Sequence, residues 1–357
     1  MKEIYSDVIQ FRGTHYEFGY KQGLALKHSL AVENRANQWK IRKPRFTIDA
    51  VETKKAITRF APAIWDELEG LQEALAWPME KVLMEFGGYR LDIAKSGCSI
   101  LTGKNFLARN YDYHPKTYEG RYVLFQPADT GYAIIGPSQR VTGRMDGMNE
   151  KGLAIGYTFI HRKNPGDGFI CCMIGRLILE SCANVQEAVR MLIDIPHRHS
   201  FSYVIYDKSG ETRIVEASPR GVAVREGNIC ANHFEILKKE NRHHLADSKR
   251  RTEILAGQKE KIANAKAAFR LLNARDQGVF SELYGSWAGT IHTAVYLPKK
   301  LEAWIALGGD SELARFDFAK WLAGEDVELT RITGKVDTDI PFLHMDEGAD
   351  WFKHGQG

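Results

Sequence analysis

The fold of this chain is decided by residues 97–113, which read GCSILTGKNFLARNYDY. Two short apolar runs flank Gly103-Lys104, and a two-residue loop that begins with glycine is typical of a type II′ β-hairpin. If these two residues form the loop, Cys98 lies directly opposite Arg109, with Cβ atoms about 4.5 to 5.5 Å apart. A neighbouring guanidinium favours the thiolate, which is the nucleophilic form of cysteine. The alternative is a buried structural cysteine in an ordinary hairpin.

The same residues carry a family resemblance. Gly97-Cys98-Ser99 opening a hairpin that ends in Arg-Asn-x-Asp-aromatic resembles the start of the mature chain in N-terminal nucleophile (Ntn) hydrolases. The similar proteins are choloylglycine hydrolase, penicillin V acylase, the penicillin-forming acyltransferase and acid ceramidase. Further stretches resemble this group in order and spacing: RGTHYEFGY at residues 12–20, DGMNEKGLA at 146–154 and ANHF at 231–234. The resemblance extends from about residue 10 to about residue 255.

The resemblance implies a self-cleaving precursor whose new N-terminal residue is Cys98. Cleavage between Gly97 and Cys98 would leave residues 1–97 as a mostly helical pro-segment or small subunit. Residues 98–357 would carry the nucleophile, and both pieces would share one structural domain. In the family the freed α-amino group serves as the base, and its reference pKa of about 7.7 to 8.0 lies near working pH. The implied fold is a four-layered αββα sandwich.

Arg109 and Asp112 are the first two candidate partners of the thiol. Arg109 is expected to poise the thiol and contact substrate, and Asp112 to accept a hydrogen bond from the α-amine. A strict strand would point Asp112 away from the face that bears Arg109, so we expect a bend near Asn110. The alternative is that the two residues pair with each other as a surface salt bridge.

Three later residues complete the candidate site. Asn232 resembles the family's oxyanion-hole asparagine, whose amide donates to the developing negative oxygen, although asparagine at a strand end is also a common turn residue. Phe159 falls where relatives carry asparagine or tyrosine beside the oxyanion hole. It is assigned to substrate binding, and a backbone N–H would then have to supply the second donor. Arg251, in a Ser-x-x-Arg pattern, resembles the second catalytic arginine, with the adjacent Arg250 as the alternative.

Composition excludes several other classes of function. The chain has 357 residues, 44% hydrophobic and 26% charged, and its net charge of +4 implies neither a nucleic-acid nor an anionic-membrane partner. The N-terminus lacks an apolar signal region and no run of 18 apolar residues occurs, so a cytoplasmic protein is expected. Five cysteines without scaffold spacing argue against a disulfide framework, and the four besides Cys98 are predicted to be core residues. Since no metal-ligand, P-loop or dinucleotide motif occurs, we expect neither a metal nor a cofactor.

Apolar periodicity predicts an α+β fold. A Thr14–Glu17 capping box begins a helix expected to reach about Gln38, and further helices begin near Thr47, after Pro62 and at Pro78. After Cys98 the pattern gives strands, two helices, more strands, two helices and a closing hairpin. This order is typical of two antiparallel sheets covered by helices, although periodicity alone also permits other α+β folds.

The sequence therefore indicates an enzyme that hydrolyses a linear, non-peptide amide of a small molecule through a thioester on Cys98. One alternative is transfer of the acyl group to an amine or to coenzyme A by the same residues. Another is a non-catalytic binding protein that keeps the fold but never matures. His114, His161 and His233 have no signature of a Cys-His dyad, and a homo-oligomer stays possible.

Overall fold

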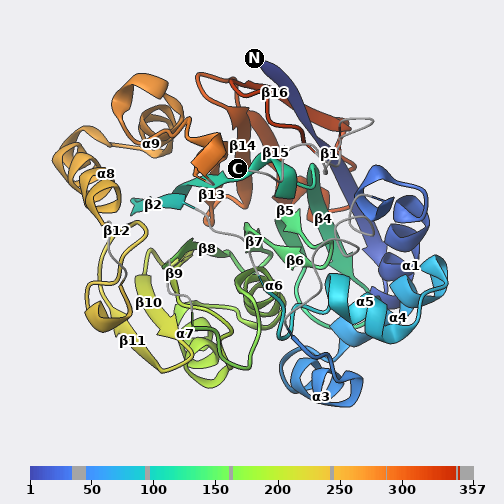
Figure 1. Ribbon diagram of the computed structural model, residues 1–357. Coiled ribbons are helices and arrows are strands. Elements are labelled where there is room, and N and C mark those ends of the chain that lie inside the picture. Colours follow the sequence, from blue (N-terminus) through green and yellow to red (C-terminus); the bar gives the residue numbers. More distant parts are fainter. Residues whose placement is uncertain are drawn as a thin grey trace.

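The structure is a computed structural model that describes residues 1–33, 46–92, 97–160, 164–241, 245–286, 288–342 and 345. Its strands form one hydrogen-bonded sheet in the order β11-β10-β9-β8-β7-β5-β4-β1-β16-β14-β13-β3-β2-β12, with β6 on β5 and β15 on β14 (Figure 1). The strands are β1 (Lys2–Gly13), β2 (Gly97–Gly103), β3 (Phe106–Tyr113), β4 (Arg121–Pro127), β5 (Ile134–Gln139), β6 (Gly143–Arg144), β7 (Asp146–Asn149), β8 (Leu153–Phe159), β9 (Phe201–Asp207), β10 (Thr212–Ser218), β11 (Gly221–Arg225), β12 (Ile229–Cys230), β13 (Gly289–Leu297), β14 (Glu302–Gly308), β15 (Ala314–Asp317) and β16 (Arg331–Val336).

Helices form the outer layers and the N-terminal side of the molecule. They are α1 (His15–Leu26), α3 (Ala50–Phe60), α4 (Ala63–Leu75), α5 (Met79–Phe86), α6 (Cys171–Ser181), α7 (Val185–Asp194), α8 (Ala246–Gly257), α9 (Ala265–Asn273) and α10 (Phe318–Leu322). Among the residues described, no helix is long and apolar enough to cross a bilayer.

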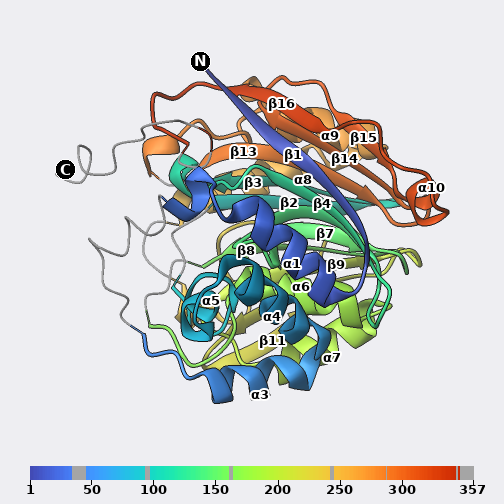
Figure 2. The ribbon, with the colours of Figure 1, turned by 90° about the vertical axis from the view of Figure 1, so that its right-hand side faces the viewer.

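The long sheet folds back on itself into two packed layers. β2 and β3 lie face to face with β8, so closely that a Cβ on Gly156 would come within 3.1 Å of Ile100 Cδ1. On the outside, α6 and α7 cover β7 to β10, and α8 and α9 cover β2, β3 and β13 (Figures 1 and 2). This confirms the predicted αββα sandwich. The two expected sheets are joined, because β5, β4, β1 and β16 carry the hydrogen bonding from one layer to the other.

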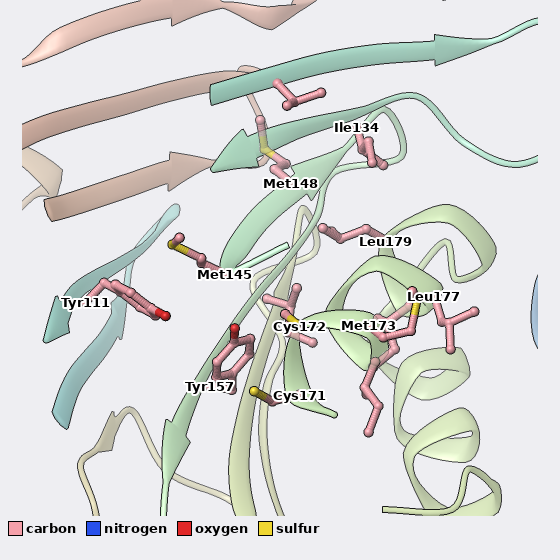
Figure 3. Packing of buried hydrophobic residues seen from close by; sticks show 14 of the residues in the cluster. Tyr111, Ile134, Met145, Met148, Tyr157, Cys171, Cys172, Met173, Leu177 and Leu179 are labelled. Carbon is pink, nitrogen blue, oxygen red and sulfur yellow. The ribbon is translucent and has the colours of Figure 1, made fainter. Parts of the chain in front are cut away.

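The β2–β3 hairpin separates two hydrophobic cores. Cys98, Ile100 and Tyr111 point into the core between the sheets, part of which is shown in Figure 3. On the other face, Leu101 and Phe106 pack beneath α8 and α9. Burial of both faces explains why the hairpin reads as two continuous apolar runs rather than as an alternating pattern.

The predicted loop of this hairpin is wrong by one position. The loop is Lys104-Asn105, because Gly103 pairs with Phe106, and Asn105 adopts the left-handed conformation with φ 67°, which asparagine tolerates well. Arg109 therefore stands opposite Ile100, and Cys98 opposite Tyr111. The register moves by two residues, so Arg109 keeps the face of Cys98 as a diagonal neighbour.

β1, which precedes Cys98 in the chain, lies in the middle of the sheet. β1 pairs in parallel with β4 and antiparallel with β16. The predicted capping box of Thr14 and Glu17 is present, although α1 ends at Leu26 rather than near Gln38, which lies outside the described residues. If the chain is cut before Cys98, the two ladders of β1 would still hold the pieces together.

α1 and α4 approach closely through glycine. A Cβ on Gly19 would lie 2.0 Å from the backbone oxygen of Glu67, and one on Gly70 would lie 2.2 Å from the backbone oxygen of Tyr16. Because these obstacles are backbone atoms, no side-chain rotation can relieve the overlap. The contact gives a physical reason for glycine at position 19 in the RGTHYEFGY stretch.

We expect Gly19→Ala to lower the free energy of unfolding by about 1 to 3 kcal/mol through overpacking, with a lower melting temperature. Gly257→Ala is the matched control, since nothing lies within 4 Å of a Cβ at that position. Equal melting temperatures for the two variants would show that α1 and α4 do not pack as described.

Candidate functional site

Cys98 lies wholly inside the protein, with a relative exposure of 0%. Arg109 Nη2 donates to Cys98 Sγ at 2.8 Å, so the two predicted partners are in direct contact. Burial nevertheless outweighs the guanidinium and raises the pKa of Cys98 from 9.0 to about 11. Arg109 thus favours the thiolate, as expected, but burial is the larger effect, and the thiol stays protonated near neutral pH.

Arg109 is itself held by groups that were not among the predicted site residues. Its Nη1 donates to the Met145 carbonyl at 2.8 Å and lies 3.2 Å from Asp146 Oδ2. His292 Nε2 lies 2.9 Å from the same carboxylate, and the Tyr296 hydroxyl donates to its other oxygen. Burial opposes the charge of Asp146, but His292 and Arg109 hold its pKa below the ordinary value.

The same part of the core is aromatic. The Arg109 guanidinium lies 4.9 Å from the ring centre of Tyr111 and 5.5 Å from that of Tyr157, and Figure 3 shows both tyrosines near Met145.

Of the groups around Arg109, only Asp146 carried a signal in the sequence, as the first residue of the DGMNEKGLA stretch. Asn149, in the same stretch, has a structural role, since its Nδ2 donates to the carbonyls of Leu179 and Cys182.

Asp112 lies on the opposite face of β3 from Arg109. β3 runs without a break through Tyr113, so the bend predicted near Asn110 is wrong. The irregularity lies instead in β13, between Thr290 and His292. The Asp112 side chain accepts a hydrogen bond from Thr290 Oγ1 at 2.7 Å and lies beside Gly97, its Oδ2 3.1 Å from where a Cβ would stand. A surface salt bridge with Arg109 is also wrong, because both side chains are buried and face away from each other.

Arg251 approaches Cys98 from the helical side. Its Nη1 donates to the Cys98 carbonyl at 2.7 Å and to Ser99 Oγ at 2.6 Å, and lies 4.0 Å from Asp112 Oδ2. The neighbouring Arg250 is half exposed and bonds to Gly278 and Asp247 instead. The structure therefore brings Arg251, and not Arg250, to the thiol-bearing residue.

Asn232 joins the groups on both faces of β2. Its Oδ1 accepts hydrogen bonds from the Cys98 backbone N–H at 2.9 Å and from Arg251 Nη2 at 2.8 Å. Its Nδ2 donates to the Phe159 carbonyl at 2.9 Å. Phe159 thus touches the site through its backbone, while its ring packs against Phe201 with centroids 5.2 Å apart.

The remaining sequence candidates lie apart from these contacts. Cys171, Cys172, Cys182 and Cys230 are all buried, as predicted. His233 bonds to Ser248 Oγ at 2.7 Å, whereas His161 lies outside the described residues. Within the described part of the chain, no group of three or more His, Cys, Asp or Glu side chains could hold a metal.

A hollow of about 460 Å³ lies at the tip of the β2–β3 hairpin, lined among others by Lys104, Tyr206 and Lys299. Gly103 at this tip is about 16 Å along β2 from Cys98 at the usual rise per residue. The hollow is therefore not where a substrate meets the thiol. Because Cys98 is fully covered, a substrate can reach Sγ only after the covering atoms move or are released.

Comparison with known proteins identifies related sequences and folds. A sequence model of the family described as "Acyl-coenzyme A:6-aminopenicillanic acid acyl-transferase" matches residues 101–312. The match spans more than half of the chain and contains Arg109, Asp112, Asn232 and Arg251, but it begins after Cys98. It confirms the resemblance predicted from the sequence. No curated protein sequence matches the chain significantly.

Three similar solved structures come from different organisms. Penicillin V acylase from Agrobacterium tumefaciens is 17% identical, with a TM-score of 0.47 over 63% of this chain and 86% of the other. A mutant of conjugated bile acid hydrolase from Clostridium perfringens is 14% identical, with a TM-score of 0.43 over 67% and 97%. The Caenorhabditis elegans ortholog of N-acylethanolamine-hydrolyzing acid amidase is 12% identical, with a TM-score of 0.40 over 57% and 93%.

We expect Asp112→Asn to stabilise the uncut fold at neutral pH. Burial raises the pKa of Asp112 from 3.8 to about 6, although Arg251 and Thr290 oppose the shift. Between these values the folded carboxyl keeps a proton that the unfolded one has released. The free energy of unfolding therefore falls as pH rises from about 4 to about 6, and the loss, about 3 kcal/mol, is complete above that interval.

Denaturant unfolding of Asp112→Asn and the parent protein, both in a Cys98→Ala background that cannot cut itself, measures this effect. The two free energies should converge below about pH 4 and separate as the pH rises to about 6. A difference that stays constant over this interval would mean that Asp112 titrates normally in the folded protein.

Proposed function

Because the chain belongs to the acyl-coenzyme A:6-aminopenicillanic acid acyl-transferase family, we propose that it is a self-cleaving acylase that acts on linear amides. The observation that carries this proposal is that Cys98 is contacted both at its sulfur and at its backbone nitrogen. Arg109 Nη2 contacts Sγ at 2.8 Å, and Asn232 Oδ1 accepts from the backbone nitrogen at 2.9 Å. The nucleophile and the nitrogen that would become its base are thus positioned on one residue before any cleavage.

Self-cleavage begins with attack of Cys98 Sγ on the carbonyl carbon of Gly97. The C–N bond then breaks, the nitrogen takes up the thiol proton, and a thioester joins Gly97 to Sγ. Water hydrolyses the thioester, which releases the Gly97 carboxylate and leaves Cys98 with a free thiol and a free α-amine. Asp112, whose carboxyl lies beside Gly97 and whose pKa of about 6 is near neutral, passes the proton to the leaving nitrogen.

The same groups then act on an external amide. The α-amine of Cys98 takes the thiol proton, and Sγ attacks the amide carbon of the substrate. The Asn232 amide donates to the developing oxyanion, while Arg109 stabilises the thiolate. The α-ammonium returns this proton to the substrate nitrogen, the C–N bond breaks and the amine product leaves. Water then attacks the acyl-thioester, which releases the carboxylic acid and the free thiol. Arg251 holds the Cys98 carbonyl and Asn232 in place, and Phe159 with its aromatic neighbours lies beside the acyl group.

Acyl transfer to an amine or to coenzyme A is the second candidate, supported by the name of the family that the chain matches. It uses the same thioester and differs only in whether water or a bound acceptor attacks it. A binding protein that never matures is disfavoured, because binding alone gives no reason for the polar contacts of Arg109, Asn232 and Arg251 to the buried Cys98. We propose no metal or cofactor in either reaction.

We expect the purified chain to separate on a denaturing gel into pieces of residues 1–97 and 98–357. Cys98→Ala should stay in one piece, because no thiol is available for attack. Denaturing conditions are required, since β1 pairs with β4 and β16 on either side. Intact mass fixes the cut at Gly97–Cys98. Cleavage that persists in Cys98→Ala would refute self-processing by this thiol.

We expect Asn232→Ala, once processed, to lose about 10² to 10³ in kcat with a much smaller change in KM, because the lost donor acts mainly in the transition state. Asn232→Asp is the matched variant, since it keeps an acceptor for the Cys98 nitrogen but removes the amide donor. Both variants are assayed with a panel of acyl-amides after processing is checked by mass. If Asn232→Asp turns over like the wild type, the oxyanion role is wrong and Asn232 only positions Cys98.

A further inference from the structure

A second buried polar cluster lies on the other side of β5 and β6, away from the thiol. Arg144 has a relative exposure of 0%, and its Nη1 donates to the carbonyls of Val141, Thr142 and Gly143 at 3.3, 3.2 and 2.9 Å. Its Nε and Nη2 have no hydrogen-bond partner among the described residues. Burying guanidinium donors without hydrogen-bond partners costs free energy, so we expect these donors to bind an acceptor.

Ser138 supplies a third donor at the same place. It pairs directly with Arg144 across β5 and β6, which puts the two Cβ atoms about 4.5 to 5.5 Å apart on one face. Ser138 is 1% exposed, and within the described part of the chain its hydroxyl has no partner either. Two directly paired, buried side chains thus have donors without partners on one face of these strands.

Glu67 and Glu180, the carboxylates whose charge acts on Arg144, form hydrogen bonds with other cations. Arg176 Nη2 donates to Glu67 at 2.7 Å, and its Nε to Glu180 at 2.5 Å. His15 Nε2 lies 3.2 Å from the same Glu180 carboxylate. No ion pair joins Arg144 to a carboxylate of the described residues. Burial, with the charge of Arg176 next, lowers the pKa of Arg144 to about 9, although the charges of Glu67 and Glu180 oppose the shift.

We propose that Arg144 and Ser138 form a buried halide site. A halide carries the single negative charge that Arg144 lacks, and it accepts hydrogen bonds from any direction. Its small size suits a position without exposure to solvent. A phosphate or sulfate would bring a second charge and a larger volume into the same enclosed place.

The site would stabilise the segment that holds the thiol's arginine. The turn between β5 and β6 contains Arg140 and Val141 in the left-handed region, at φ 54° and 64°, and for β-branched valine this conformation is strained. Arg144 closes the turn by bonding its carbonyls. The next residue, Met145, accepts from Arg109 Nη1. A bound halide therefore supports the backbone that positions Arg109.

The test compares melting temperatures of the wild-type protein in equal concentrations of sodium bromide and sodium gluconate, so that screening is the same. Bromide should raise the melting temperature by roughly 2 to 4 °C once it is well above its dissociation constant. Ser138→Ala should remove most of this rise. Ser202→Ala is the matched control, because Ser202 is another buried strand serine without a hydroxyl partner among the described residues, and should keep it.

Crystals grown in bromide locate the ion by its anomalous scattering. A peak within hydrogen-bond distance of Arg144 Nη2 supports the proposal. Equal melting temperatures in the two salts, or an ordered water without anomalous signal at the guanidinium, would overturn it. Neither measurement depends on amidase activity, so its outcome is separate from that of the proposed function.

Discussion

The contact between Arg109 and Cys98 inside a closed core is the constraint on which the rest of the site depends. A thiol with no exposure to water is held protonated by burial, and a guanidinium beside it cannot reverse that effect alone. Burying the guanidinium requires a counter-charge, which Asp146 supplies at 3.2 Å. Asp146 in turn needs partners, and His292 and Tyr296 provide them. One buried thiol–cation pair thus accounts for a set of polar residues within an otherwise apolar sheet interface.

The hairpin geometry divides the tasks between its two faces. The inter-sheet face carries Sγ and Arg109, and the helical face carries Asp112 and the contacts of Arg251 to the Cys98 carbonyl. Asn232 reaches the nitrogen between them. In the proposed mechanism, Arg109 on the first face stabilises the nucleophile. Asp112 and Arg251 on the second face act around the Cys98 nitrogen, which changes from amide to amine. In the same proposal the uncut chain is inactive toward substrate, because its thiol is fully covered.

Much of the fold can be predicted, because it depends on local signals. The capping box at Thr14, the break at Pro62 and the change of pattern at Cys98 are each encoded within a few residues. The hairpin loop is predicted at Gly103-Lys104, because a glycine in first position is typical of a type II′ turn. The loop is instead Lys104-Asn105, in which Asn105 is left-handed. The error of two in register leaves Arg109 on the correct face. Asp146 stands out only as part of a motif, and His292 and Tyr296 are missed, since β13 meets β3 through pairing that no local pattern reveals.

In the proposed reaction Cys98, as an N-terminal residue, carries the acyl group during turnover. The most direct measurement is mass spectrometry of the acid-quenched protein during reaction with a slow acyl-amide. We expect an added acyl mass on the peptide that begins at Cys98, removed by hydroxylamine and absent after the thiol is alkylated. Steady turnover with no acyl mass on that peptide, or with the mass on another residue, would contradict it.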